Sequence, residues 1–107
     1  MFKISINNRA LKHIKNGKKK IEGRLNKGIF TQVKIGDKIL FFNNSDICNV
    51  KITNIKIYDT FSNMLTKENF YNTLPYCKNL NEGIFLYNNI YKNQKKFKVM
   101  AIHFDLL

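Results

Sequence analysis

The sequence predicts an α+β fold: a small, curved, barrel-like β-sheet of about five or six strands with two to four short helices. Short segments with alternating apolar residues recur between turn signals, which is typical of strands. Asn and Thr residues precede apolar segments with helical spacing, as capping residues do. One long strand segment changes the face of its apolar residues midway, as bulged strands of small barrels do. With 107 residues, the chain fits one domain spanning residues 1–107.

The N-terminal segment predicts a strand followed by a helix. Apolar side chains alternate over residues 2–6, which indicates the strand. Asn7 or Asn8 is suited to cap the helix, because an asparagine side chain accepts a hydrogen bond from a free N–H of the first turn. The apolar face of this helix contains Ala10, Leu11 and Ile14. Gly17 fits the left-handed position that commonly follows a helix end.

Residues 19–25 predict a second strand with one apolar and one charged face. Along it, Ile21 and Leu25 alternate with Lys20, Glu22 and Arg24. Alternating side chains point to opposite sides of a strand. A charged strand face is normally exposed to solvent, so substituting Glu22 or Arg24 is expected to leave stability nearly unchanged.

The middle of the chain predicts two adjacent strands, over residues 38–42 and 47–57. A turn at 33–37 leads into the first strand, and a turn at 43–46 joins the two. In the second strand, the apolar residues change face between Val50, Ile52 and Ile55, Ile57. This change predicts a bulge or sharp bend near residues 53–54.

The last part of the chain predicts short helices and a closing strand. Thr60 is suited to cap a short helix with Phe61, Met64 and Leu65, Thr66 can begin another, and Pro75 ends it. Asn81 can open a helix with Ile84, Tyr87 and Tyr91 on one face. Residues 97–106 predict the final strand.

The charge of the chain favours a polyanionic partner. Lys and Arg number 19 against 7 acids, which gives a formal charge of +12. Coulomb attraction and counterion release then favour nucleic acid. The alternative is a bias toward AT-rich codons, because the chain is rich in Lys, Asn and Ile while only Arg9 and Arg24 are arginines.

Other signals concern compartment and cofactors. The N-terminus has no signal-peptide pattern, and no apolar run approaches the length that spans a membrane. Cys48 and Cys77 match neither a zinc motif nor a disulfide framework. We therefore expect an intracellular protein, in cytoplasm or nucleus, without a metal, a cofactor or a membrane partner.

A set of motifs resembles a known family. Gly17, Lys19, Glu22 and Arg24 form the pattern G-x-K-x-x-E-x-R. Together with residues 33–41, 58–65, 82–91 and 99–104, in that order, they resemble an ASCH domain (activating signal cointegrator homology), within the PUA-like superfamily. The resemblance covers nearly the whole chain. It implies a β-barrel with a cleft lined by the motif, and a link to RNA or modified nucleosides.

The charged segment supplies the candidate ligand-binding residues Lys19, Lys20, Glu22 and Arg24. A carboxylate accepts from an exocyclic amine, while an arginine binds a phosphate or a carbonyl edge. The alternative is a surface ion pair worth roughly 0–1 kcal/mol. Strand alternation places Lys20 beside Glu22, whereas the family pattern selects Lys19; we follow the pattern and keep Lys20 in reserve.

A catalytic interpretation adds Glu82 to Lys19 and Glu22. In the related bacterial acetylcytidine amidohydrolases, a motif lysine and threonine work with a helix glutamate. The resemblance places Lys19 and Glu82 at two of these positions, while Glu22 stands where the threonine would be. That difference argues against the same hydrolytic mechanism. Catalysis would require Lys19 and Glu82 to converge, and pairing with Glu22 and Glu82 would keep Lys19 cationic.

Three classes of function follow. The preferred one is a module that binds RNA or a single nucleotide in a basic cleft, with Tyr87 added as a ligand contact. Tyr58, Tyr71 and Tyr76 can stack on a base if they lie at the cleft rim. The alternative is a small hydrolase that acts on a modified nucleoside, or a ribonuclease. The third is an adaptor with a protein partner.

Overall fold

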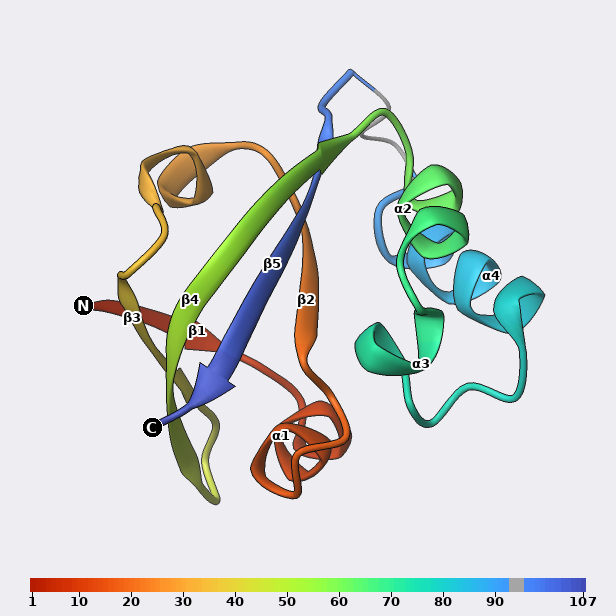
Figure 1. Ribbon diagram of the computed structural model, residues 1–107. Helices are drawn as coiled ribbons and strands as arrows, with labels where there is room; N and C mark the ends of the chain where they lie inside the picture. Colours follow the sequence, from red (N-terminus) through yellow and green to blue (C-terminus); the bar gives the residue numbers. More distant parts are fainter. Residues whose placement is uncertain (93–95) are drawn as a thin grey trace.

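Five strands form one mixed sheet whose two edge strands follow one another in the chain. The computed structural model describes residues 1–92 and 96–107. The strands are β1 (Phe2–Ser5), β2 (Ile21–Leu25), β3 (Lys38–Phe42), β4 (Ile47–Tyr58) and β5 (Val99–Leu106). Their spatial order is β1-β3-β4-β5-β2, with β1 parallel to β3 and the other pairs antiparallel. The sheet curls into a half-barrel (Figure 1), which confirms the predicted α+β class.

Four α-helices and one 3₁₀ helix accompany the sheet in the described residues. They are α1 (Asn8–Lys15), η1 (Gly28–Gln32), α2 (Phe61–Lys67), α3 (Phe70–Thr73) and α4 (Leu80–Ile90). In Figure 1, α2, α3 and α4 lie together on one side of the sheet, and α1 lies at the bottom of the half-barrel. Helix η1 was not predicted from the sequence.

The helix caps show where local patterns succeed and fail. Asn7 accepts from the N–H of Ala10, and Thr60 from that of Asn63, as predicted. Two other predicted starts are wrong. Thr66 does not begin a helix, because it lies inside α2 and its hydroxyl donates to the Ser62 carbonyl. Asn69 caps α3, and Asn79 rather than Asn81 caps α4.

The predicted bulge in β4 is confirmed. Ile52 pairs with Phe104, whereas Asn54 pairs with the next residue, His103, so Thr53 is the extra residue. Before the bulge, Val50 and Ile52 are buried in the half-barrel core. The extra residue bends the strand and changes which face its later side chains share.

Strand β5 connects two hydrophobic cores. Met100, Ile102 and Phe104 belong to the core inside the half-barrel, which α1 also covers. Val99 and Ala101 belong to a second core between the sheet and helices α2–α4. Because successive side chains point to opposite faces, one strand buried on both sides joins the cores.

Gly23 in β2 is the point where the helical layer comes closest to the sheet. A Cβ atom at this position would lie 2.8 Å from Tyr87 Oη and 2.9 Å from Met64 Cε. Both neighbours are buried. The absence of a side chain at Gly23 therefore allows α2 and α4 to pack directly on the strand backbone.

We expect Gly23→Ala to destabilise the fold by about 1–3 kcal/mol, the usual cost of overpacking a dense core. Urea denaturation followed by circular dichroism measures this loss. Gly28→Asn is the control, because nothing lies within 4 Å of a Cβ there and asparagine tolerates its φ of 59°. An unchanged urea midpoint for Gly23→Ala would contradict this account of the packing.

Candidate functional site at the barrel seam

The half-barrel stays open between its edge strands, β1 and β2. A hydrogen bond crosses this seam, in which Arg24 Nη2 donates to the Ser5 carbonyl at 3.2 Å. A cleft of about 230 Å³ lies here, between the β1–α1 loop, β2 and α4. Its lining includes Arg9, Glu22, Arg24, Tyr76, Tyr87 and Tyr91.

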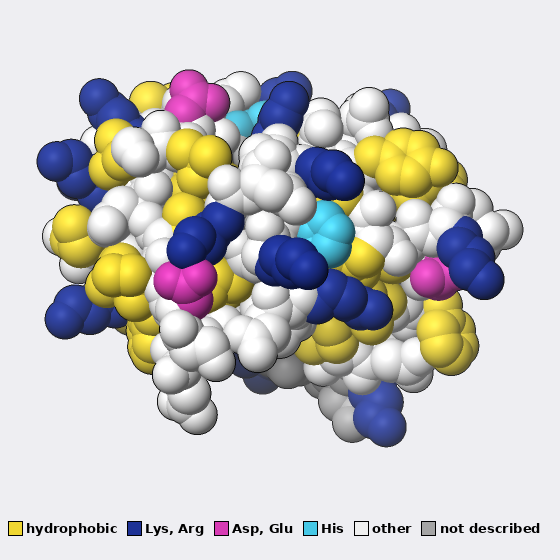
Figure 2. All heavy atoms as spheres, turned by 90° about the horizontal axis from the view of Figure 1, so that it is seen from below, with side chains coloured by type: hydrophobic (Ala, Val, Ile, Leu, Met, Phe, Trp, Pro, Cys, Tyr) yellow, Lys and Arg dark blue, Asp and Glu magenta, His cyan; other side chains and the backbone are white. Residues whose placement is uncertain are grey.

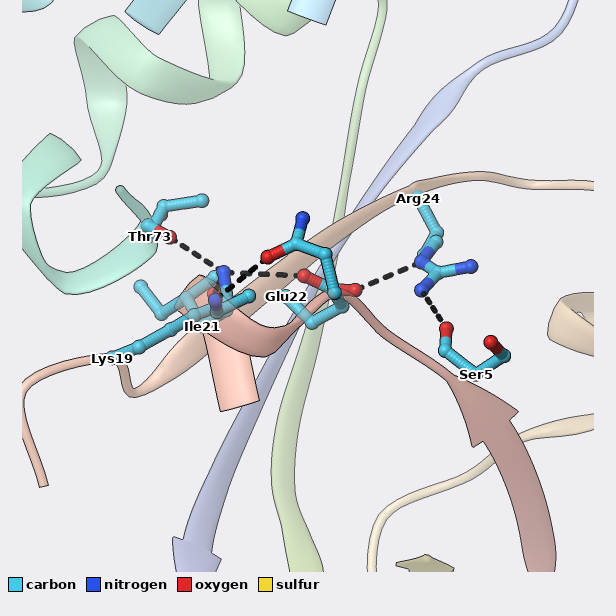
Figure 3. A network of polar contacts seen from close by, with 8 residues as sticks. Ser5, Lys19, Ile21, Glu22, Arg24 and Thr73 are labelled. Carbon is cyan, nitrogen blue, oxygen red and sulfur yellow. Dashed lines mark hydrogen bonds and ion pairs between the residues drawn. The ribbon is translucent and has the colours of Figure 1, made fainter. Parts of the chain in front are cut away.

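A buried polar network lies behind the cleft, with Glu22 at its centre (Figure 3). Glu22 Oε1 lies 3.1 Å from Lys19 Nζ, and Oε2 lies 2.9 Å from Arg24 Nε. Lys19 Nζ also donates to the carbonyls of Ile21, at 2.8 Å, and Thr73, at 2.5 Å. An ammonium has three N–H donors, and these three oxygens occupy all of them.

The burial of this network corrects the expectation of a solvent-exposed charged face. Lys19 is 2 % exposed and Glu22 is 6 % exposed, while the Arg24 side chain is 22 % exposed. Strand alternation predicted the charged face but not what covers it. The Thr73 carbonyl reaches the network from α3, and the Ser5 carbonyl reaches it from β1. An ordinary surface ion pair is therefore excluded.

The structure also decides which lysine contacts Glu22. Gly17, with φ of 82°, turns the chain after α1, and the N–H groups of Lys18 and Lys19 both donate to the His13 carbonyl. Lys19 precedes β2, so strand alternation does not apply to it, and its side chain contacts Glu22. The Lys20 side chain is exposed, and this residue contributes a backbone hydrogen bond instead: its N–H donates to the Asn72 carbonyl at 2.7 Å.

The two cations keep Glu22 ionised. Burial alone would raise the pKa of this carboxyl, but Lys19 and Arg24 together lower it below the usual value. Burial lowers the pKa of Lys19 below its usual value, and the opposing Glu22 carboxylate offsets only part of that shift, so pairing does not dominate as expected. An ionised carboxylate only accepts hydrogen bonds, so Glu22 presents acceptors to the cleft.

The cleft gathers both arginines of a chain that otherwise uses lysine. Arg24 belongs to the network, and the Arg9 guanidinium lies 4.0 Å from the ring centre of Tyr76. No lysine is among the described residues that line the cleft. Figure 2 shows Lys and Arg side chains spread across the face around α1. Among the described residues, the basic side chains that line the cleft are therefore Arg9 and Arg24.

Aromatic side chains form the α4 side of the cleft. Phe61 stacks on Tyr87, with ring centres 4.4 Å apart, and on Tyr91, at 4.9 Å. Tyr87, a predicted ligand contact, lines the cleft but is buried against Gly23. Among the predicted stacking candidates, Tyr76 lines the cleft and Tyr71 does not. Tyr58 instead donates to Glu68 at 2.6 Å.

Glu82 is not brought to Lys19. It is exposed in the first turn of α4, where its N–H donates to the Asn79 side chain, and it does not line the cleft. Tyr87, further along α4, lies against Gly23 of β2, and Tyr91, just after the helix, lines the cleft beside it. Sequence reasoning also missed Arg9 as a cleft residue. The sequence feature that could have indicated Arg9 is the rarity of arginine, since only two of the 19 basic residues are arginines.

Within residues 1–92 and 96–107, no three His, Cys, Asp or Glu side chains gather into a group that could hold a metal ion. No helix in these ranges is long and apolar enough to cross a membrane.

Known proteins resemble the chain in sequence and in fold. The ASCH domain profile matches residues 4–107. The crystal structure of hypothetical protein PH0355 is 36% identical, with a TM-score of 0.89 and coverage of 99% of this chain and 98% of that one. The solution structure of PF0455 from Pyrococcus furiosus is 37% identical, with a TM-score of 0.80 and coverage of 99% and 96%.

More distant similarity extends to the fold alone. ZmASCH from Zymomonas mobilis, in its S128A form, is 17% identical, with a TM-score of 0.70. The alignment covers 96% of this chain and 66% of that one. No curated protein matches the sequence.

Glu22→Gln should destabilise the protein by about 3–5 kcal/mol at neutral pH, because it leaves Lys19 buried without its counter-charge. Urea denaturation measures the loss. The double variant Lys19→Met/Glu22→Gln should be more stable than Glu22→Gln alone, since it removes the uncompensated cation. The burial of Glu22 therefore replaces the expectation, drawn from the sequence, that substituting this residue would leave stability nearly unchanged. Equal stability of wild type and Glu22→Gln would show that the pair is energetically unimportant.

The contribution of Glu22 to the stability of the fold should be lost at acidic pH. Its folded-state pKa is lowered, so its stabilisation is fully present above its unfolded pKa of about 4.3 and is lost as pH falls through the folded value. The stability difference between wild type and Glu22→Gln should therefore shrink from pH 7 to pH 3. The difference is the right measurement, because Asp46, Asp59 and Glu68 also have lowered pKa values. A constant difference over this range would refute an ionic role.

Proposed function

We propose that this chain, which belongs to the ASCH domain family, binds a nucleotide of RNA in the seam cleft. One observation carries the proposal: a buried, ionised carboxylate opens onto a cleft that gathers both arginines of the chain. In this arrangement Glu22 accepts from donor groups of the base, and the arginines bind phosphate or carbonyl oxygens.

The free-energy cost of burying this network supports a functional role. Burying an ion pair is expensive, and well-packed apolar residues of similar volume often give equal or greater stability. Buried groups with shifted pKa values are also concentrated at functional sites. A carboxylate with both oxygens fixed, beside a cleft, is therefore better explained by recognition of a ligand than by stability.

The two arginines have different tasks in this proposal. A guanidinium carries five N–H donors, and the bonds of Arg24 to Glu22 and Ser5 use two of them. Arg24 can therefore hold Glu22 and contact a ligand at the same time. Arg9 lies over the Tyr76 ring, with its guanidinium carbon 4.0 Å from the ring centre, and its place in the cleft lining suits it to bind a phosphate.

The geometry around Lys19 favours the hydrolase alternative less than the binding module. A nucleophilic Lys19 would need an accessible amine, but its side chain is 1 % exposed and its three donors are bonded. Glu82 does not lie beside it to move a proton. Lys19, with its three contacts to Glu22, Ile21 and Thr73, is suited to hold Glu22 in place, which makes it a positioning residue for binding.

We expect wild-type protein to bind nucleoside 5′-monophosphates, measured by isothermal titration calorimetry at low salt. Arg9→Gln should weaken binding about tenfold, the loss expected for one charge-assisted phosphate contact. Arg9 is exposed, so the variant should remain folded. Arg24→Gln should weaken binding further. Lys51→Gln removes one charge from an exposed site on β4 and serves as the control.

Two outcomes would count against the proposal. One is the absence of binding at millimolar nucleotide. The other is an equal effect of Arg9→Gln and Lys51→Gln, which would indicate attraction by net charge alone. The same protein should also be assayed on acetylated cytidine and short RNAs. Robust turnover that Lys19→Met abolishes would place the hydrolase ahead of the binding module.

A further inference from the structure

A second groove shares Tyr91 with the seam cleft. Its volume is about 530 Å³, and it runs between the end of β2, the start of β5, α2 and α4. Leu25 and Val99 line it from the sheet, and Phe61, Tyr91 and Phe97 add aromatic surface. None of these residues belongs to the Lys19–Glu22–Arg24 network. The groove is thus a separate, largely apolar feature.

Cations surround the exposed aromatic side of this groove. Phe97 is half-buried, with Lys27 Nζ 5.0 Å and Lys96 Nζ 5.2 Å from its ring centre. Lys92 lines the groove as well. The acid in the lining, Asp59, is already paired with Lys98 at 2.6 Å. An apolar groove with lysines around it complements a flat aromatic ring that carries a phosphate.

Tyr91 connects this groove to the seam cleft. Its side chain lines both, and Phe61 stacks behind it at 4.9 Å. An RNA strand with one nucleotide in the seam cleft would therefore pass across Tyr91 and reach the second groove. A base stacked there gains contact with Phe97, and the lysines gain contact with the backbone.

We infer that this groove is a second nucleotide subsite, which binds the neighbouring base of a single-stranded RNA whose first nucleotide occupies the seam cleft. The inference rests on the proposed function of that cleft. It names the ligand class more closely: an oligonucleotide rather than a free nucleoside or mononucleotide.

The test compares ligand lengths by isothermal titration calorimetry. The probes are the RNA tetranucleotides of adenosine and of uridine, with the matching 5′-monophosphates. Wild-type protein should bind a tetranucleotide at least about tenfold more tightly, since one additional stacked base contributes that much. Phe97→Ala should remove about tenfold of tetranucleotide affinity and change monophosphate affinity less than twofold. Phe85→Ala, on an exposed ring of α4 outside both sites, should change neither.

A second variant pair covers the case in which Phe97→Ala unfolds. Ser62 lines the groove in the first turn of α2, where an acid is compatible with a helix. Ser62→Glu should weaken tetranucleotide binding much more than Ser62→Gln, because the carboxylate repels a phosphate. Monophosphate binding should be the same in both variants.

The outcomes separate this inference from the proposed function. If Arg9→Gln weakens monophosphate binding but Phe97→Ala and Ser62→Glu leave tetranucleotide affinity unchanged, the second subsite is refuted and the seam site stands. Equal affinities of wild type for monophosphates and tetranucleotides refute it too. If neither kind of probe binds, the proposed function fails and the second subsite fails with it.

Discussion

The position of one carboxylate determines how the open side of this half-barrel is built. Glu22 holds Lys19 with one oxygen and Arg24 with the other, and each cation then binds a backbone carbonyl of a different segment. Lys19 reaches Thr73 at the end of α3, and Arg24 reaches Ser5 at the end of β1. The edge strand β2 is thereby tied to a helix on one side and to the other edge strand across the seam.

The same contacts limit the chemistry of the site. A buried charge is tolerated only when it is paired and hydrogen-bonded, and each member of this network meets that condition through the others. Lys19 uses all of its donors inside the protein, so it supplies charge and geometry rather than a reactive amine. Glu22 stays an acceptor because two cations stabilise its ionised form. A rigid acceptor beside arginine donors supports the proposal of ligand recognition.

Local patterns predicted the elements but not their contacts. The bounds of β3, the bulge at Thr53 and the Thr60 cap follow from rules that act over a few residues, and the structure confirms them. The burial of the charged face of β2 depends on Ser5 and Thr73, which are distant in sequence. Alternation selected Lys20, whereas Lys19 contacts Glu22, because Lys19 precedes β2 and alternation does not apply to it. Helical spacing placed Tyr87 and Tyr91 on one face, but only packing on Gly23 shows that this face meets β2.

The distribution of basic residues separates two contributions to any binding of RNA. Most of the +12 charge comes from lysines that lie away from the seam cleft, and these attract phosphates without selecting a position. The two arginines lie in the cleft, where planar N–H groups can fix a ligand beside Glu22. Codon bias explains an excess of lysine, but it does not explain why both arginines occur at one cleft. Specific recognition should therefore depend on the seam, while the surrounding lysines set the overall strength and its sensitivity to salt.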